Sequence, residues 1–145
     1  MSRTVIRALC GSIAAFALVI FASEMNPSHA EDSALSNPGV GPVKKIDVGP
    51  IDPKLVDQGK ATFASKCSAC HKFGERYVGP DLAGVTSRRS PEWIMNMILN
   101  PQEMIQKDPV AQELFGEFLV PMTFQNVSEP EARAILEYIR AQEKQ

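Results

Sequence analysis

The strongest metal-binding side chains of this 145-residue chain are concentrated in five consecutive residues. Residues 67–71 read C-S-A-C-H and contain Cys67, Cys70 and His71, whereas the whole chain has 3 cysteines and 2 histidines. The other two of these residues, Cys10 and His29, lie near the N-terminus. Outside the N-terminal segment, the chain therefore has two thiols and one imidazole side by side as its strong metal ligands.

The first 30 residues have the pattern of an export signal. A positively charged start is followed by an apolar run at 13–22, and small residues stand at positions 28 and 30, just before Glu31. The run is shorter than the roughly 20 residues that span a bilayer, so an uncleaved anchor is the weaker alternative. We predict a signal peptide at 1–30 and an exported, periplasmic protein. Cleavage would also remove the N-terminal cysteine and histidine.

Three interpretations compete for the C-x-x-C-H motif. A structural zinc site needs four ligands, but two thiols and one imidazole supply only three. A thioredoxin-type redox pair belongs to a βαβ setting, which the sequence does not indicate. Covalent haem attachment needs two thiols about one helical turn apart and a histidine directly after them, under the iron. The motif meets all three of these needs, so we predict one covalently bound haem c, attached to Cys67 and Cys70, with His71 as an iron ligand.

The hydrophobic pattern predicts an all-α domain over residues 51–145. Residues 31–50 are rich in proline and glycine and have no apolar period, which is typical of a flexible leader. Helical periodicity and capping residues predict helices that begin near residues 52, 90, 100, 108 and 128. The intervening segments 74–90 and 120–127 read as irregular loops, and we expect the loops to carry the chemistry.

The order of these features resembles the class I, monohaem c-type cytochromes from about residue 54 to residue 141. The resemblance implies the small cytochrome c fold, with helices wrapped around one covalently attached haem. It implies that the Pro80 carbonyl accepts a hydrogen bond from His71, and that Gly59 allows two helices to cross closely. The insert between residues 101 and 119 departs from the shortest members. The matching segments are Gly59 with Phe63, residues 67–71, residues 78–82 (V-G-P-D-L), Pro121-Met122 and residues 132–138 (A-R-A-I-L-E-Y).

The second protein ligand of the iron is expected to be a methionine, because no histidine other than His71 follows the signal segment. Met95 and Met97 lie at core positions of a predicted helix, and Met104 lies in the first turns of a short one. Met122 follows a proline in an irregular loop, where the family has its distal methionine. We predict Met122 as the ligand; the alternative is a gap-filling loop methionine. For the haem propionates the donor candidates are Tyr77, Arg88, Arg89 and Trp93, any of which could instead be core or solvated.

These features predict a periplasmic protein that carries one electron on a His/Met-ligated haem c and acts as a carrier rather than an enzyme. The alternatives are a haem enzyme or gas sensor with a labile sixth ligand, and an electron-entry subunit of a respiratory reductase or oxidase tethered by residues 31–50. The expected partners are redox proteins. A net charge of -2 and a pI of about 5.7 argue against nucleic acid. Membrane association is expected only if residues 1–30 are retained.

Overall fold

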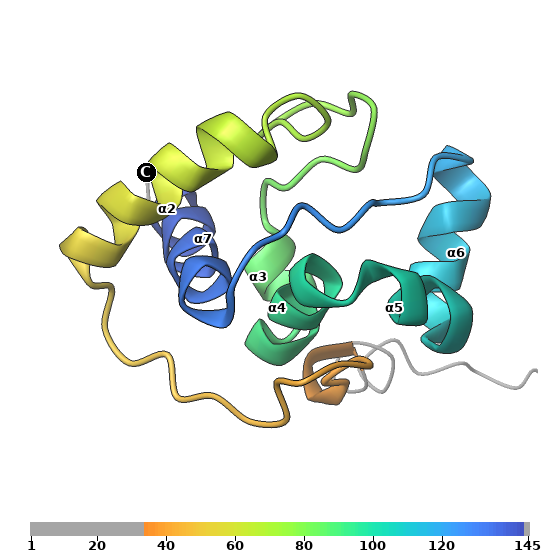
Figure 1. Ribbon diagram of the computed structural model, residues 1–145, viewed down its shortest axis with the longest axis horizontal. Helices are drawn as coiled ribbons and strands as arrows, with labels where there is room; N and C mark the ends of the chain where they lie inside the picture. Colours follow the sequence, from red (N-terminus) through yellow and green to blue (C-terminus); the bar gives the residue numbers. More distant parts are fainter. Residues whose placement is uncertain (1–33, 144–145) are drawn as a thin grey trace, which may run out of the picture.

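The protein is all-helical over residues 34–143, the part that the computed structural model describes (Figure 1). No β-strand occurs among these residues, as the sequence predicts. The predicted export signal at 1–30 lies outside the described residues. No helix in the described range is long and apolar enough to cross a membrane. The helices are α2 (Pro53–Lys66), α3 (Val85–Arg88), α4 (Pro91–Leu99), α5 (Pro101–Lys107), α6 (Pro109–Phe118) and α7 (Glu129–Gln142).

Capping side chains determine where the longer helices begin. Asp52, Ser90 and Asp108 each accept a hydrogen bond from a backbone N–H of the first turn, and a proline stands at the start of each helix. At α7, Ser128 and Glu131 form the predicted capping box, with the Ser128 N–H donating to Glu131 Oε2 at 2.8 Å. These helix starts agree with the sequence-based expectation.

The short helix α3 lies in a stretch predicted to be irregular. It has four residues and follows Gly84, which has a left-handed φ of 69° and provides no side-chain cap. Neither a periodic apolar stripe nor a capping residue therefore marks this turn in the sequence. The rest of the segment 74–90 is loop and turn, as expected.

Helices α2 and α7 cross each other (Figure 1). Gly59 of α2 lies at this crossing, which is close because Gly59 has no side chain. A Cβ atom at Gly59 would overlap the carbonyl group of Ala134 and lie 2.9 Å from Tyr138 Cβ. The Tyr138 ring packs beside the crossing against Phe63 and Phe73, with centroid distances of 5.4 and 5.8 Å. The predicted helix crossing is present, with the α7 backbone as the main obstacle to a larger residue.

Residues 37–50, which we call the strap, pack against the helices instead of forming a leader without buried surface. Asn96 on α4 is fully buried, and its side chain binds the strap backbone three times. It accepts from the Val43 N–H at 3.0 Å and donates to the carbonyls of Val43 and Pro38 at 2.8 Å each. Val43 itself is 5% exposed. The expectation of a flexible leader at 31–50 is corrected for this part, because helix side chains bind its backbone.

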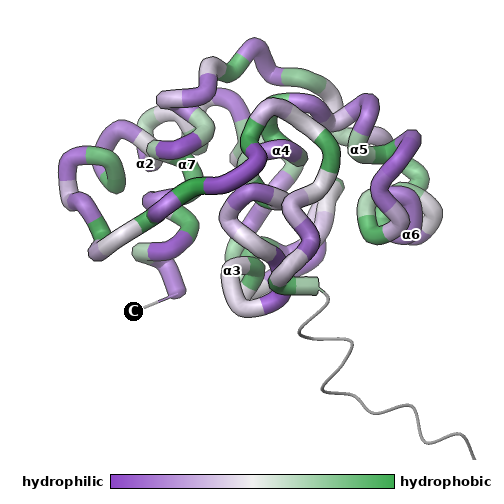
Figure 2. The backbone as a smooth tube through the Cα atoms, turned by 90° about the horizontal axis from the view of Figure 1, so that it is seen from below, coloured by the Kyte–Doolittle hydropathy of each residue, from purple (hydrophilic) through white to green (hydrophobic). Residues whose placement is uncertain are grey.

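The end of the strap is held by a buried charge cluster on α7. Glu137 is fully buried, pairs with Arg133 and Arg140, and accepts a hydrogen bond from the Asp52 N–H at 2.9 Å. Arg133 and Arg140 in turn donate to the Val48 carbonyl. In the view from below, the strap crosses in front of the helices (Figure 2). The folded unit therefore includes the strap as well as the helices that follow it.

Candidate functional site

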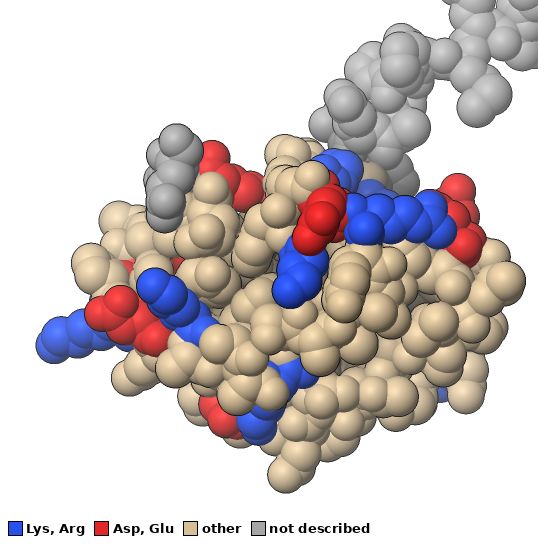
Figure 3. All heavy atoms as spheres, turned by 90° about the horizontal axis from the view of Figure 1, so that it is seen from above, with Lys and Arg blue, Asp and Glu red and all other residues tan. Residues whose placement is uncertain are grey.

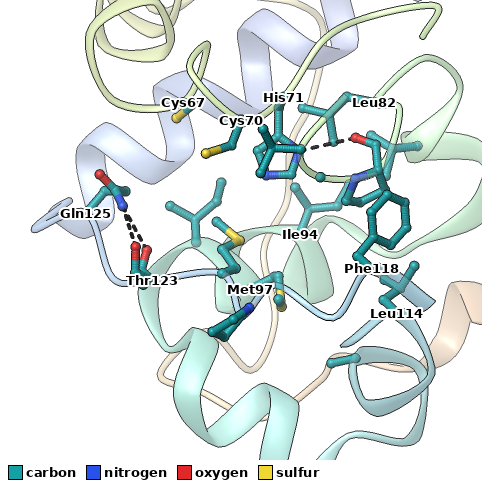
Figure 4. Close-up of a pocket in the computed structure, with 18 of the residues that line it drawn as sticks. Cys67, Cys70, His71, Leu82, Ile94, Met97, Leu114, Phe118, Thr123 and Gln125 are labelled. Carbon is teal, nitrogen blue, oxygen red and sulfur yellow. Dashed lines mark hydrogen bonds between the residues drawn. The ribbon is translucent and has the colours of Figure 1, made fainter. Parts of the chain in front are cut away.

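A large cavity opens between residues 67–82 and the helices α4 to α6 (Figure 4). It encloses about 1370 Å³ of space, part of which is open to solvent. Every helix from α2 to α7 contributes to its walls, together with the loop 120–125. Such an apolar, concave site suits a large apolar ligand with a few polar contacts. The apolar lining includes Phe63, Ile94, Ile98, Ile105, Leu114, Phe118, Val120, Ile135 and Ile139.

The C-x-x-C-H motif forms one wall of the cavity. The chain turns directly after α2, and the N–H groups of Cys70 and His71 both donate to the Cys67 carbonyl at 3.0 Å. This turn brings both sulfur atoms and the imidazole to the same wall (Figure 4). Burial raises the pKa of the Cys67 thiol to about 11, despite the opposing effect of the nearby Lys66 charge. The structure thus brings together the three residues that the motif singled out.

The imidazole of His71 is oriented by the loop that follows it. Its Nδ1 atom lies 3.2 Å from the Pro80 carbonyl oxygen (Figure 4). A carbonyl oxygen can only accept, so Nδ1 carries the proton and Nε2 keeps its lone pair. Gly79 allows this arrangement, because a Cβ there would lie 2.7 Å from His71 Cε1. Burial lowers the pKa of His71, partly offset by the bond to Pro80, and so favours the neutral form that a metal ligand requires.

The four candidate methionines separate into two pairs. Met95 and Met104 are fully buried and do not line the cavity; Met104 Sδ accepts from the Val40 N–H at 3.0 Å instead. Met122 lines the cavity from the loop after α6, as expected for a ligand of a group bound there. Met97 also lines the cavity, although its helical spacing indicated a core position (Figure 4). Of these four methionines, Met97 and Met122 therefore bring their thioether sulfur atoms to the cavity.

The four candidate polar donors have different surroundings. Tyr77 is exposed and does not line the cavity. Trp93 lines the cavity, but its Nε1 donates to the buried Asp108 carboxylate at 3.0 Å. Arg88 and Arg89 line the cavity and donate to main-chain carbonyls of their own segment. The two arginines are therefore the positively charged candidates at the cavity among these four.

The insert between residues 101 and 119 forms part of the cavity wall, which the sequence alone did not reveal. It contains the α5–α6 hairpin, and Leu114 and Phe118 of α6 face the cavity (Figure 4). Arg76, from the loop after the motif, pairs with Glu117, and its guanidinium lies 3.9 Å from the Phe118 ring centroid. Apolar periodicity indicated helices here, but it could not show which face lines a cavity.

Comparison with known proteins gives consistent matches. The cytochrome c family profile matches residues 56–143. A cytochrome c from Rhodothermus marinus has a similar structure, with a TM-score of 0.72 and 43% identity, over 79% of this chain and 97% of that one. An engineered cytochrome c from the same organism, bound to a carbene intermediate, has a TM-score of 0.68 and 41% identity, over 83% of this chain and 100% of that one.

Another relative matches this chain over only part of its own length. The cytochrome c-553-like protein of Synechocystis sp. is 38% identical over 61 residues, which cover 40% of this chain and 58% of the relative. The family profile covers more than half of the chain, so the chain belongs to the cytochrome c family and its cofactor is covalently bound haem c. The cavity fits this group, because two thiols and an imidazole with a free Nε2 stand on one wall and a thioether sulfur is available in the loop 120–125.

Proposed function

We propose that the protein carries single electrons on a haem c that is attached to Cys67 and Cys70 and ligated by His71 and Met122. The observation that carries this proposal is the cavity itself, which brings the motif and the Met122 loop to one apolar space. With His71 and Met122 as its ligands, the haem iron would have no open position for a substrate, so electron transfer to a partner would remain. The haem supplies the iron that takes up and releases the electron.

The surrounding residues support this role by tuning the site. The Pro80 carbonyl accepts the His71 Nδ1 proton at 3.2 Å, which increases the basicity of Nε2 toward a metal. The apolar lining disfavours the more highly charged oxidised state and so raises the reduction potential, as does a thioether ligand. The half-exposed Val120 and Phe115 lie at the cavity and give a partner protein an apolar approach to it.

A second candidate is a haem protein whose sixth position opens to a small molecule. It is supported by the loop 119–127, which makes few hydrogen bonds to other elements among the described residues: the Leu119 N–H donates to the Phe115 carbonyl where α6 ends, and Lys66 donates to the Asn126 carbonyl. It is also supported by the engineered Rhodothermus relative, which is 41% identical and binds a carbene intermediate. The two functions differ in whether Met122 stays bound to the iron.

We further propose that the protein is exported to the periplasm after cleavage before Glu31 and docks there with redox proteins. On the face in Figure 3, basic and acidic side chains lie beside each other around a broad uncharged area, and they do not form separate patches of one sign. Interspersed charges of both signs steer an approaching partner protein less than a patch of one sign does. Sequencing the N-terminus of the exported protein tests the cleavage site; a mature chain that retains residues 1–30 would contradict it.

The experiment that tests the carrier function is visible spectroscopy of the haem-bearing full chain and of Met122→Ala. Haem should stay with the polypeptide after extraction with acidic organic solvent. The oxidised protein should be low-spin, with a sulfur–iron charge-transfer band that Met122→Ala abolishes. The variant should also have a lower reduction potential and should bind carbon monoxide readily when reduced.

Met97→Leu is the matched control, because Met97 is the other methionine at the cavity. It should keep the band, as should Met104→Leu in the core. Loss of the band in Met97→Leu with retention in Met122→Ala would show that the ligand assignment is wrong. An unmodified protein that is high-spin and binds carbon monoxide would favour the second candidate function instead.

A further inference from the structure

The loop that carries Met122 is attached to the rest of the protein at its two ends. It begins at Leu119 and nears its end at Asn126, and both residues have a left-handed φ, 57° and 51°. Between them the side chain of Gln125 bonds only to Thr123 within the loop, at 2.8 Å to Oγ1 (Figure 4). Leu119 is 76% exposed, so its side chain does not anchor the first end. Its N–H donates to the Phe115 carbonyl at 2.9 Å, so the first end is held by α6, and the contact with a distant element is made at the second end.

The second end is anchored by Lys66, the last residue of α2. Its Nζ donates to the Asn126 carbonyl at 2.9 Å, across 60 residues of sequence. No other hydrogen bond joins residues 119–127 to a distant element within the part of the chain that the structure describes. Lys66 also directly precedes Cys67, so the same residue belongs to the motif wall and restrains the opposite loop.

Glu131 completes this junction. Its Oε1 lies 3.6 Å from Lys66 Nζ, and its Oε2 accepts from the Ser128 N–H at the start of α7. The carboxylate therefore holds the ammonium beside the Asn126 carbonyl while it caps the helix that follows the loop. Val127, which lies between Asn126 and Ser128 in the sequence, is buried. The end of α2, the end of the loop and the start of α7 meet at these side chains.

We propose that Lys66 is a positioning residue for Met122: its ammonium holds the loop closed and so stabilises the iron–Met122 bond. This inference rests on the proposed function, in which Met122 is the sixth ligand. Without the anchor, the loop opens more often, Met122 leaves the iron more often and a small ligand can enter. The haem attachment and the overall fold do not depend on this hydrogen bond.

The test measures how fast cyanide binds to the oxidised, haem-bearing protein in Lys66→Met, Lys66→Arg and Lys60→Met. Lys66→Met should raise the rate about fivefold, the effect expected of one partly exposed, charge-assisted hydrogen bond. Lys66→Arg keeps a charged donor and should restore most of the original rate. Lys60→Met is the matched control, because Lys60 is exposed on the same helix and bonds to no other described side chain. It should not change the rate.

Denaturant midpoints separate positioning from general destabilisation. Lys66→Met loses one hydrogen bond of the folded state, so its midpoint should fall slightly below that of Lys60→Met, in keeping with the same fivefold factor, while their cyanide rates differ. A much larger fall in the midpoint would show general destabilisation and overturn the positioning role. Equal cyanide rates in these two variants, with a sulfur–iron band in both, would overturn the role of Lys66 and leave the proposed function intact. Absence of that band from the unmodified protein would overturn both. If Lys66→Met gives little haem-bearing protein, Lys66→Gln makes the same measurement, with the same expected rise.

Discussion

Replacing Asn96 with alanine should lower the free energy of unfolding by about 3 kcal/mol. The side chain lies fully buried between α4 and the strap and makes three hydrogen bonds to the backbone of Val43 and Pro38. Each such bond contributes about 1 kcal/mol net, and a buried group left without a partner costs about 1–3 kcal/mol. Val43 is 5% exposed, so water replaces the lost amide poorly.

The assay is denaturant unfolding of the haem-bearing protein, followed by far-ultraviolet circular dichroism. Asn100→Ala is the control, because Asn100 donates one long bond of 3.3 Å to the Val40 carbonyl and its other bond goes to a surface glutamate. It should cost less than about 1 kcal/mol. The visible spectrum should not change in Asn96→Ala, since Asn96 does not line the cavity.

A loss below about 1 kcal/mol in Asn96→Ala would refute the reasoning, because it would show that the strap backbone does not need these bonds. Removal of residues 31–50 gives a second measurement on the same question. A chain that begins at Ile51 should lose at least as much stability as Asn96→Ala. The flexible leader expected from the sequence would contribute little stability.

Two other substitutions test the crossing of α2 with α7 and the buried charge cluster. Gly59→Ala should destabilise by about 3 kcal/mol or more in thermal or denaturant unfolding, because overlap with the Ala134 backbone outweighs a gain in helix propensity of about 1 kcal/mol; a stabilised variant would contradict the close crossing. Burial raises the pKa of Glu137, but hydrogen bonds from Arg133, the Asp52 N–H and Arg140 outweigh burial and hold the pKa below its ordinary 4.5. A lowered folded pKa gives stability that is present above the unfolded pKa and is lost as the pH falls through the folded one, so unfolding from pH 7 to pH 3 should be less steeply pH-dependent in Glu137→Gln. Parallel pH profiles would contradict this account.

The helices could be predicted because their signals are local. Asp52, Ser90, Asp108 and Ser128 each provide a cap within the first turn, and a proline follows close behind. Gly84 provides no such cap, so the four-residue α3 was not predicted. A short helix that depends on its surroundings leaves little trace in its own sequence.

The strap could not be predicted because most of its hydrogen bonds to the helices are made by its backbone; the Asn37 side chain, which donates to Asp108, is an exception. The side chains that bind it belong to Asn96, Glu92, Arg133 and Arg140, far along the sequence. Proline and glycine in the strap read as disorder, although Gly41 is needed there: a Cβ would lie 2.6 Å from Asn96 Cγ. Side chains that bind the backbone of a distant segment cannot be recognised from the composition of that segment.

The candidate site also contains residues that the sequence could predict and residues that it could not. Cys67, Cys70 and His71 are contiguous, so their chemistry could be inferred from spacing alone. Met97 was interpreted as a core residue because its spacing on α4 fits a buried stripe, yet the same stripe lines the cavity. Periodicity identifies the apolar face of a helix, but does not distinguish packed protein from a space that holds a large apolar group.

The strap also has a consequence for the order in which the chain folds. Its partners come much later in the sequence, with separations of 53 residues to Asn96 and 92 residues from Val48 to Arg140. A contact between residues so far apart in the sequence must close a long loop, which costs entropy before the contact is gained. The strap is therefore synthesised first, but it can dock only after α4 and α7 have been made. Protease cleavage within residues 37–50, followed over time after synthesis, would report the moment at which the strap has docked on α4 and α7.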